Sequence, residues 1–551
     1  MSLQREEIGP IPEETARVAK ASFPKGNRYM RLRDALGTIF DDEEFTDLFA
    51  RRGQPAEAPW RVGLVCIVQY MEELTDRQAA DAVRARMDIK YLLGLELSDP
   101  GFDFSVLSEF RQRLIEHDAE HRLFTLLVAK LSEQGYIKKR GIQRTDSTHV
   151  LAAVHLFHRA ELLGETLRAA LNEVATQEPD WLKQWVPADW FERYSRRVEL
   201  WRLGIAKGEK DAFMEQVGRD GSQLLSALSQ QEAPPHLSHL PQVQLLRQMW
   251  VQQFFWEEGS LRLRNKDALP PAHLTIRSPY DPQAHFGQKR DLTWYGYKVH
   301  FSETCDPDFP HLITCVQTTD ATTTDMQQTQ HVHEEMERRD LLPHTHLVDE
   351  GYVDAGAIVQ SRQTHAIVLL GPVSRNNQWQ AKAGQGYDRS GFSIDWEAHE
   401  ATCPQGNKSV YWRERTDQHG HPNISIRFDR QACQHCPARS HCTRSPDAPR
   451  LLTIRSKEEF LQLQSTRQQQ ETSEFRATYA ARSGIEGTHS QGVRALGLRR
   501  TRSIGLEKTG LQHFLTATAI NCIRIDDFLA GAKTEKTRTS HFAALAPEKV
   551  A

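Results

Sequence analysis

Residues 141–146 have the sequence GIQRTD, and the periodicity of the apolar residues changes at this point of the chain. Between residues 27 and 135, apolar side chains recur every three or four positions, which is typical of amphipathic helices. GIQRTD predicts a short β-strand that ends at Asp146. The elements expected after it are strands at 294–301, 312–319, 345–349 and 365–373, and helices at 325–340 (with Asp325 as N-cap), 353–362, 457–485 and 511–523.

In chain order, the elements expected from residue 141 onward are three strands, a helix, a strand, a helix, a strand and a helix. This order is typical of the RNase H-like fold, in which helices flank a mixed β-sheet, so we expect an α/β core of that kind. The expected domains are an all-α N-terminal domain at 1–140, the core at 141–154, 291–373 and 457–531, a helical insertion at 155–290, a cysteine-rich insertion at 374–456 and a disordered tail at 532–551.

The N-terminal domain contains a pattern of helix, tight turn and helix over residues 60–87. Thr75 begins the sequence TDRQ, which predicts a capping box with Gln78 at the start of the second helix. The pattern is compatible with a DNA-binding helix-turn-helix, and a plain helical bundle explains it equally well.

The composition is that of a globular protein, with 39% hydrophobic and 26% charged residues. There is no apolar run of about 18 residues, and the N-terminal sequence MSLQREEIGPIPEE lacks the apolar region of a secretory signal. We therefore expect a cytoplasmic protein with no membrane contact. The formal net charge of −4 gives no support to DNA binding, so any contacts with phosphate must come from local basic patches.

Three carboxylates fall at matching points of the expected core. Asp146 and Asp349 each end a predicted strand, and Glu486 lies at the end of the long predicted helix. Neighbouring strands are about 4.8 Å apart, and two-metal phosphoryl transfer needs several carboxylates around ions about 3.5–4 Å apart. Alone, each residue could cap a turn, begin a loop or be a surface charge. Together they predict a site for two Mg²⁺ or Mn²⁺ ions, with Asp146, Asp349 and Glu486 as ligands.

The motifs around these carboxylates resemble those of bacterial insertion-sequence transposases of the DDE kind. They are RTDSTHV at 144–150, LVDEGYVDA at 347–355 and YAARSGIEGTHSQ at 479–491. The resemblance is to the subgroup with an N-terminal helical domain and a cysteine-bearing insertion. It implies a metal-dependent enzyme, nucleoid-associated when bound, that cuts double-stranded DNA at the ends of its element and joins them to target DNA. A homodimer on DNA is expected, because two ends must be brought together.

The third motif places Tyr479, Arg482 and Glu486 at positions i, i+3 and i+7, which share one face of a helix. Arg482 is expected to hold a phosphate beside the metal ions, and Tyr479 to stack or hydrogen-bond there. A simple ion pair between Arg482 and Glu486 is the alternative. Related sequences have Lys seven residues after the Glu, whereas this chain has Val493 there and Arg494 next.

A basic stretch follows Glu486 and is a candidate for contacts with the DNA backbone. Such a run could also be merely solvated. Its members are Arg494, Arg499, Arg500, Arg502 and Lys508.

Half of the eight cysteines lie in one short segment. Cys403 is followed by the group Cys433, Cys436 and Cys442, and four thiolates at this spacing suit a tetrahedral structural Zn²⁺. An iron–sulfur cluster is the alternative, and His435 or His441 could replace one thiolate. The other cysteines are expected to be buried in the core.

Two questions stay open at the level of sequence. The tryptophans of the helical insertion could stack on a flipped base or simply pack that insertion. The same motifs would also be found in a nuclease that cuts without joining, or in a catalytically silent DNA-binding regulator descended from a transposase.

Overall fold

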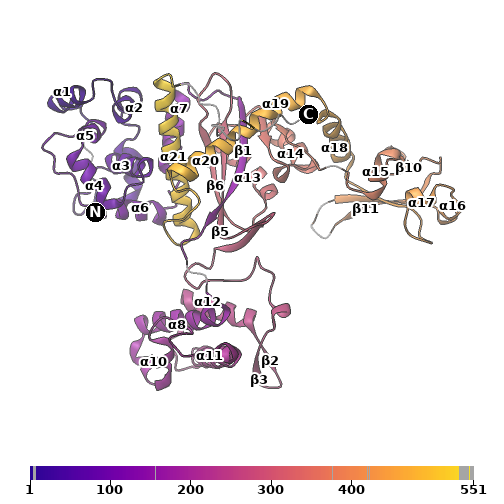
Figure 1. Ribbon diagram of the computed structural model, residues 1–551, viewed down its shortest axis with the longest axis horizontal. Coiled ribbons are helices and arrows are strands. Elements are labelled where there is room, and N and C mark those ends of the chain that lie inside the picture. Colours follow the sequence, from indigo (N-terminus) through magenta and orange to yellow (C-terminus); the bar gives the residue numbers. More distant parts are fainter. Residues whose placement is uncertain are drawn as a thin grey trace.

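A computed structural model describes residues 1–3, 8–154, 157–374, 376–417, 420, 422–532 and 545 of the chain. A central α/β body has a helical bundle on one side, a second helical lobe below it and a narrow arm on the far side (Figure 1). Within these described ranges, no helix combines the length and the hydropathy that crossing a bilayer requires.

The body is built on a mixed sheet in which the longest strand, β5, is central. On one edge β5 pairs with β1, followed by β7 and β8; β4 and β6 share its other edge. The pairing of β1 with β5 is antiparallel, whereas β1, β7 and β8 run parallel. The strands are β1 (Ile142–Leu151), β4 (His285–Lys289), β5 (Leu292–Thr304), β6 (Ile313–Asp320), β7 (Thr345–Val348) and β8 (Val368–Leu370).

The first strand is longer than the sequence predicts. We expected it to end at Asp146, but β1 continues to Leu151, because its pairing with β5 extends to Gly296. Its pairing with β7 stops at Thr145. Asp146 is therefore in mid-strand, at the first position where β1 has left β7. The last strand, by contrast, is shorter than the expected 365–373.

Side chains alternate between the two faces of β1. Thr145 and Ser147 face the helix α13 (Asp325–Arg338): Ser147 donates a hydrogen bond of 3.2 Å to Asp325. Arg144, Asp146 and Thr148 have their polar contacts on the opposite side, where α20 (Ile485–Ala495) lies. This alternation places the expected catalytic aspartate and the expected catalytic helix on the same face of the sheet.

The expected N-cap of α13 is wrong by one residue. Thr324 caps the helix in a capping box with Gln327, and Asp325 is the first helical residue. The Asp325 side chain is thereby free to contact Ser147 and Lys298, with an ion-pair distance of 3.5 Å to Lys298.

The N-terminal region is helical and packs against the long helix α21 (Leu506–Leu529), which also covers the sheet. A single apolar cluster runs from this bundle through α21 into β5 and β6. The expected capping box is present, with Thr75 and Gln78 bonded to each other. The helices are α1 (Glu13–Ser22), α2 (Arg28–Leu36), α3 (Pro59–Met71), α4 (Asp76–Ala85), α5 (Met87–Leu93), α6 (Ser105–Glu116) and α7 (Arg122–Glu133).

The lobe between β1 and β4 has its own apolar core. Trp190 and Trp250 are buried in it, as packing predicts, whereas Trp201 and Trp256 are 78% and 67% exposed and do not serve that purpose. The lobe consists of α8 (Arg159–Gln177), α9 (Pro179–Lys183), α10 (Ala188–Tyr194), α11 (Lys210–Ala227), α12 (Pro241–Gln253) and the hairpin β2 (Phe254–Glu257) and β3 (Ser260–Leu263).

The arm that follows β8 is formed by short strands and helices around a small core of its own (Figure 1). It contains α15 (Trp379–Ala383), β9 (Ser393–Asp395), β10 (Glu400–Thr402), β11 (Ser409–Thr416), β12 (Pro422–Phe428), α16 (Arg430–Gln434), α17 (Arg439–Cys442) and β13 (Leu451–Ile454). The tail expected to be disordered, 532–551, lies outside the described residues except for Ala532 and Leu545.

Several histidines are buried in the body, and burial lowers their pKa values. The pKa of His300 falls to about 4, and those of His333 and His513 fall to about 3. The pKa of His346 also lies well below its usual value. All four are therefore neutral in the folded protein at pH 7.

Because these histidines are buried and neutral, we expect the free energy of unfolding to decrease at acidic pH. In the unfolded chain a histidine takes up a proton near pH 6.5, so the unfolded state binds more protons and stability falls as the pH drops from about 6.5 towards 4. Each buried histidine costs about 2 kcal/mol at pH 5 by this linkage. Urea unfolding from pH 7 to pH 5 should show this loss. His513→Gln should reduce its slope by about one proton, whereas replacing the exposed His331 by Gln should leave the slope unchanged.

Candidate active site

Two of the expected catalytic carboxylates lie where β1 and β7 separate. Asp349 directly follows β7, and Asp146 directly follows the last residue of β1 that pairs with β7. The Asp146 side chain is 11% exposed and accepts a hydrogen bond of 2.8 Å from the amide of Ser147. The Asp349 side chain is 43% exposed. The sheet therefore carries Asp146 within β1 and Asp349 just beyond the end of β7, and Asp349 is the more exposed of the two.

The third carboxylate comes from a helical segment that crosses this end of the sheet. We expected one continuous helix over residues 457–485 that runs towards Glu486, and its continuity is wrong. The segment is divided into α18 (Lys457–Gln469), α19 (Ser473–Ala480), a 3₁₀ turn at Ala481–Gly484 and α20. Tyr479 therefore lies in α19, Arg482 in the 3₁₀ turn and Glu486 in the first turn of α20.

The guanidinium of Arg482 brings the three carboxylates together. Its Nη2 lies 2.9 Å from Asp146 Oδ2 and 3.7 Å from Asp349 Oδ2, and its Nη1 lies 3.2 Å from Glu486 Oε1. The Arg482 side chain is only 12% exposed. In this arrangement the cation between the carboxylates is a guanidinium. In the part of the chain that the structure describes, no three His, Cys, Asp or Glu side chains are positioned to hold a metal ion.

The charges at this point of the sheet shift the pKa values of its neighbours. Burial lowers the pKa of the Arg482 guanidinium, but Asp146 and Asp349 outweigh it, so that the pKa is raised overall. Burial raises the pKa of Tyr479 to about 12, with Arg482 opposing and Asp349 reinforcing the shift. Tyr479 therefore lies within electrostatic reach of the cluster and keeps its proton, so it can donate a hydrogen bond.

A polar cluster on the other face of β1 was not predicted from the sequence. There, Ser147 bonds to Asp325, and the buried Tyr352 lies 2.6 Å from His300 Nδ1. Nothing in the spacing of these residues points to it, because it joins β1, β5, α13 and the turn after β7. Burial raises the pKa of Tyr352 well above its usual value, and the charges of Asp325 and Asp146 reinforce the shift.

The basic residues after Glu486 are all exposed, and one section of them continues the sheet. The amide of Leu151, at the end of β1, donates to the carbonyl of Arg499, and the amide of Thr501 donates back to Leu151. This fixes Arg499 beside β1, where its guanidinium lies 3.3 Å from the Thr148 hydroxyl. Arg502 instead lies over the ring of Tyr70 in the N-terminal bundle.

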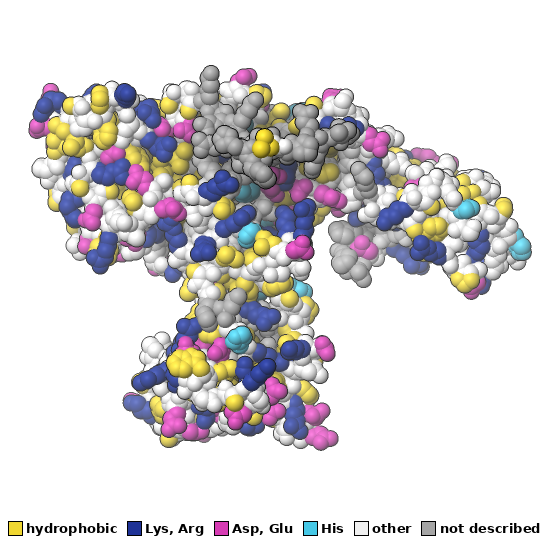
Figure 2. Space-filling model, viewed as in Figure 1, with side chains coloured by type: hydrophobic (Ala, Val, Ile, Leu, Met, Phe, Trp, Pro, Cys, Tyr) yellow, Lys and Arg dark blue, Asp and Glu magenta, His cyan; other side chains and the backbone are white. Residues whose placement is uncertain are grey.

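Figure 2 shows Lys and Arg side chains gathered over the central body, in the region that Figure 1 assigns to α20 and α21. Acidic side chains lie close to them in the same view. The exposed members of the predicted basic stretch lie in α20, in α21 and in the loop that joins them: Arg494, Arg499, Arg500, Arg502 and Lys508. Of these residues, Arg499 reaches Thr148, which lies two residues after Asp146 on β1.

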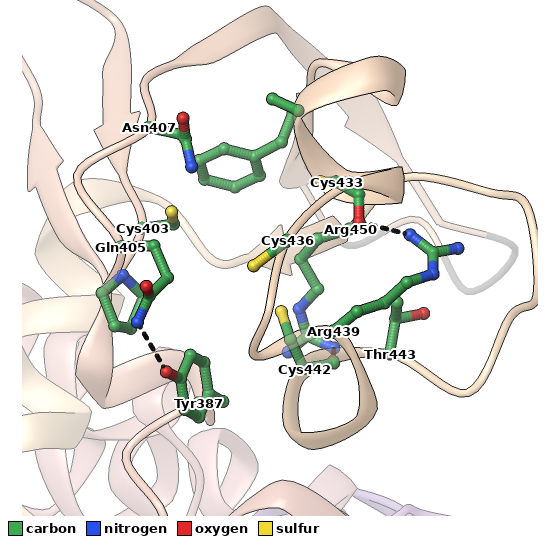
Figure 3. Close-up of a pocket in the computed structure, with 13 residues that line it drawn as sticks. Tyr387, Cys403, Gln405, Asn407, Cys433, Cys436, Arg439, Cys442, Thr443 and Arg450 are labelled. Carbon is green, nitrogen blue, oxygen red and sulfur yellow. Dashed lines mark hydrogen bonds between the residues drawn. The ribbon is translucent and has the colours of Figure 1, made fainter.

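The clustered cysteines lie together in the arm. Cys403, Cys433, Cys436 and Cys442 line a single cavity of about 30 Å³, and Figure 3 shows the sulfur atoms of Cys436 and Cys442 directed towards it. All four are free thiols. Burial raises the pKa of Cys442; Arg450 opposes this and the other thiols reinforce it. The four thiols therefore line one small cavity, together with the side chains of Arg439 and Arg450.

Comparison with known protein families gives two matches. Residues 17–113 match the family described as Transposase domain (DUF772), and residues 402–525 match the family described as Transposase DDE domain. The second match contains Arg482 and Glu486 but neither Asp146 nor Asp349. A comparison with curated proteins found no significant match. Both family matches are to transposase domains, and they support the conclusion that this chain is an insertion-sequence transposase of the DDE kind.

Proposed function

We propose that this transposase has an RNase H-like core that cuts DNA at the ends of its element and joins the freed ends to target DNA. The single observation that carries the proposal is the convergence of Asp146, Asp349 and Glu486 on one guanidinium. Within the described residues no three acidic side chains are already positioned around a metal, so in this proposal the carboxylates release the guanidinium and close around the ions. The carboxylate oxygen atoms are the donors that Mg²⁺ and Mn²⁺ prefer.

In this proposal, Asp146, Asp349 and Glu486 would hold two Mg²⁺ or Mn²⁺ ions. Such ions activate the attacking oxygen and stabilise the leaving oxygen of a phosphodiester. Asp146 lies within β1 and Asp349 follows the end of β7, while Glu486, whose side chain is 67% exposed, would close the site from the helical side. Arg482 would leave the carboxylates and bind the phosphate next to the scissile bond, where a planar guanidinium offers two parallel donors.

The reaction has two transfers of the same kind. Water first attacks the phosphorus at the element end, and the 3′-oxygen leaves as a hydroxyl. That hydroxyl would then attack a phosphodiester of the target DNA, forming a new phosphodiester bond while the 3′-oxygen of the target strand leaves as a hydroxyl. The basic residues from Arg494 to Lys508 would hold the DNA backbone beside the site, and two copies of the chain would bring two ends together.

A cleavage and joining assay tests this function. The purified protein is given supercoiled DNA with the sequences that flank its gene, with and without Mg²⁺ or Mn²⁺. Metal-dependent cuts at the element ends together with joined products support transposition. Cuts without joining would identify a nuclease, and binding without cutting at every metal concentration would identify a regulator.

We also propose that the four clustered thiols of the arm bind a structural Zn²⁺. The cavity that they line supports this, and an iron–sulfur cluster is the alternative. The purified protein is expected to contain about one zinc per chain by elemental analysis, and Cys436→Ser should lose most of it. Cys315→Ala, which removes a buried thiol outside the arm, should keep its zinc. Iron and acid-labile sulfide in place of zinc would contradict the assignment.

A further inference from the structure

A buried ion-pair network lies beneath the helical segment that carries Arg482 and Glu486. At its centre is Glu303 of β5, whose side chain is fully buried. Arg144 of β1, itself 5% exposed, donates from Nε to Glu303 Oε1 at 2.7 Å and forms an ion pair with it at 2.6 Å through Nη2. Arg524 of α21 approaches the other oxygen, Oε2, at 2.6 Å.

The network is bonded to both ends of the segment 481–488. Arg144 Nη1 donates to the carbonyl of Ala481, the residue before Arg482. The Thr488 hydroxyl, two residues after Glu486, donates to Glu303 Oε2 at 2.5 Å. The start of the segment is therefore hydrogen-bonded to Arg144, and its end is hydrogen-bonded to Glu303 through Thr488. Because Arg144 also pairs with Glu303, both ends are connected to this one buried carboxylate.

Glu303 is charged in this environment. Burial raises its pKa, but Arg524, Arg144 and the Thr488 hydroxyl outweigh burial, so that the pKa lies below its usual value. Apolar side chains of the same volume would commonly fill such a space with equal or greater stability. They would, however, let the segment slide along β1, because apolar contact has no preferred register. Directional hydrogen bonds do not permit that sliding.

We propose that Arg144 and Glu303 are positioning residues that fix the register of segment 481–488 against β1. Because Arg144 lies two residues before Asp146 on the same strand, this register sets how far Glu486 and Arg482 lie from Asp146. The inference rests on the proposed function, in which these carboxylates act together.

Gly484 provides the sharpest test, since the Arg144 guanidinium packs against its backbone. A Cβ at Gly484 would come within 2.1 Å of Arg144 Nη1 and 2.5 Å of its Cζ. A Cβ at Gly487, three residues later in the same segment, would meet nothing within 4 Å. Alanine has the higher helix propensity at both positions, so Gly484→Ala and Gly487→Ala differ chiefly in whether they displace Arg144.

The variants are compared by two measurements on the full chain: the rate of DNA cleavage, and the affinity for Mn²⁺ in the absence of DNA by electron paramagnetic resonance. We expect Gly484→Ala to cut at least ten-fold more slowly and to bind Mn²⁺ several-fold more weakly, while Gly487→Ala stays within two-fold of the wild type. In an Arg144→Ala background, adding Gly484→Ala should have no further effect, because the group that it displaces is gone.

Equal behaviour of Gly484→Ala and Gly487→Ala in both measurements would overturn the inference. If Gly484→Ala does not fold, Arg144→Lys replaces it: a lysine can pair with Glu303 but cannot also reach Ala481, so the same losses are expected. Wild-type activity and wild-type Mn²⁺ affinity in Arg144→Lys would also overturn the inference. A wild-type protein that neither cuts DNA nor loses Mn²⁺ affinity on Asp146→Asn would instead refute the proposed function itself.

Discussion

Asp146→Asn is expected to abolish DNA cleavage and to leave DNA binding intact. The substitution keeps the shape of the side chain but removes one charge from the three carboxylates that would hold the metal ions. Catalysis in a two-metal site depends on positioning and on neutralisation of charge, so a loss of roughly 1,000-fold or more is expected. Asp146 is also the most buried of the three carboxylates and the one closest to Arg482. Water therefore has little access to take the place of its carboxylate oxygens.

The measurement is the rate of strand cleavage at saturating Mg²⁺, alongside the affinity for a duplex that carries the element end. Asp349→Asn and Glu486→Gln should behave in the same way. Glu350→Gln is the matched control: Glu350 adjoins Asp349 in sequence, but its side chain is bonded to Ser374 and not to Arg482. Cleavage at the wild-type rate by Asp146→Asn, or an equal loss in Glu350→Gln, would rule out this assignment.

Arg482→Gln is expected to have opposite effects on metal binding and on cleavage. In the absence of DNA, the guanidinium neutralises the same carboxylates that a metal ion would use. Hydrogen bonds to charged groups contribute about 1.5–3 kcal/mol each, and losing this competitor should strengthen Mn²⁺ binding by about ten-fold. The cleavage rate should nevertheless fall by about 100-fold, because the group that holds the phosphate is missing.

Mn²⁺ titration followed by electron paramagnetic resonance gives the first quantity, and a cleavage assay at saturating metal gives the second. Arg476→Gln is a suitable control, since Arg476 lies in α19 and bonds to the carbonyl of Glu471. It should change neither quantity. If Arg482→Gln bound Mn²⁺ more weakly than the wild type, Arg482 would assist the metal site rather than compete for it.

The alternation of helices and strands made the α/β body predictable, because apolar periodicity is a local property of the sequence. Because apolar periodicity is local, it could not predict features that depend on residues distant in sequence. The length of β1 depends on its partner β5, which lies about 150 residues away, so GIQRTD could not reveal that the strand continues past Asp146. In the 3₁₀ turn at Ala481–Gly484, Arg144 lies against Gly484 and donates to the carbonyl of Ala481, and neither contact is local in sequence.

The candidate site was predictable to a similar extent. The residues Asp146, Asp349, Arg482 and Glu486 could be selected from predicted strand ends, from a helical spacing and from the motifs that resemble those of the family. That one guanidinium would touch all three carboxylates could not be inferred, because the sequence suggested only an ion pair between Arg482 and Glu486. The role of the buried Glu303 could not be predicted either, because its partners come from three different elements.

The helix α21 is shared between the N-terminal bundle and the sheet, and this has a mechanical consequence. Its residue Asp526 accepts ion pairs from Arg28 and Arg31 of α2, and Phe514 packs on Phe124 of α7, while His513 of the same helix bonds to Thr318 of β6. A bundle attached in this way cannot pivot on a flexible tether. A DNA duplex bound by this bundle would lie at a constant distance from Asp146. The number of base pairs between the bound sequence and the cleavage position would then be determined by the structure of the protein.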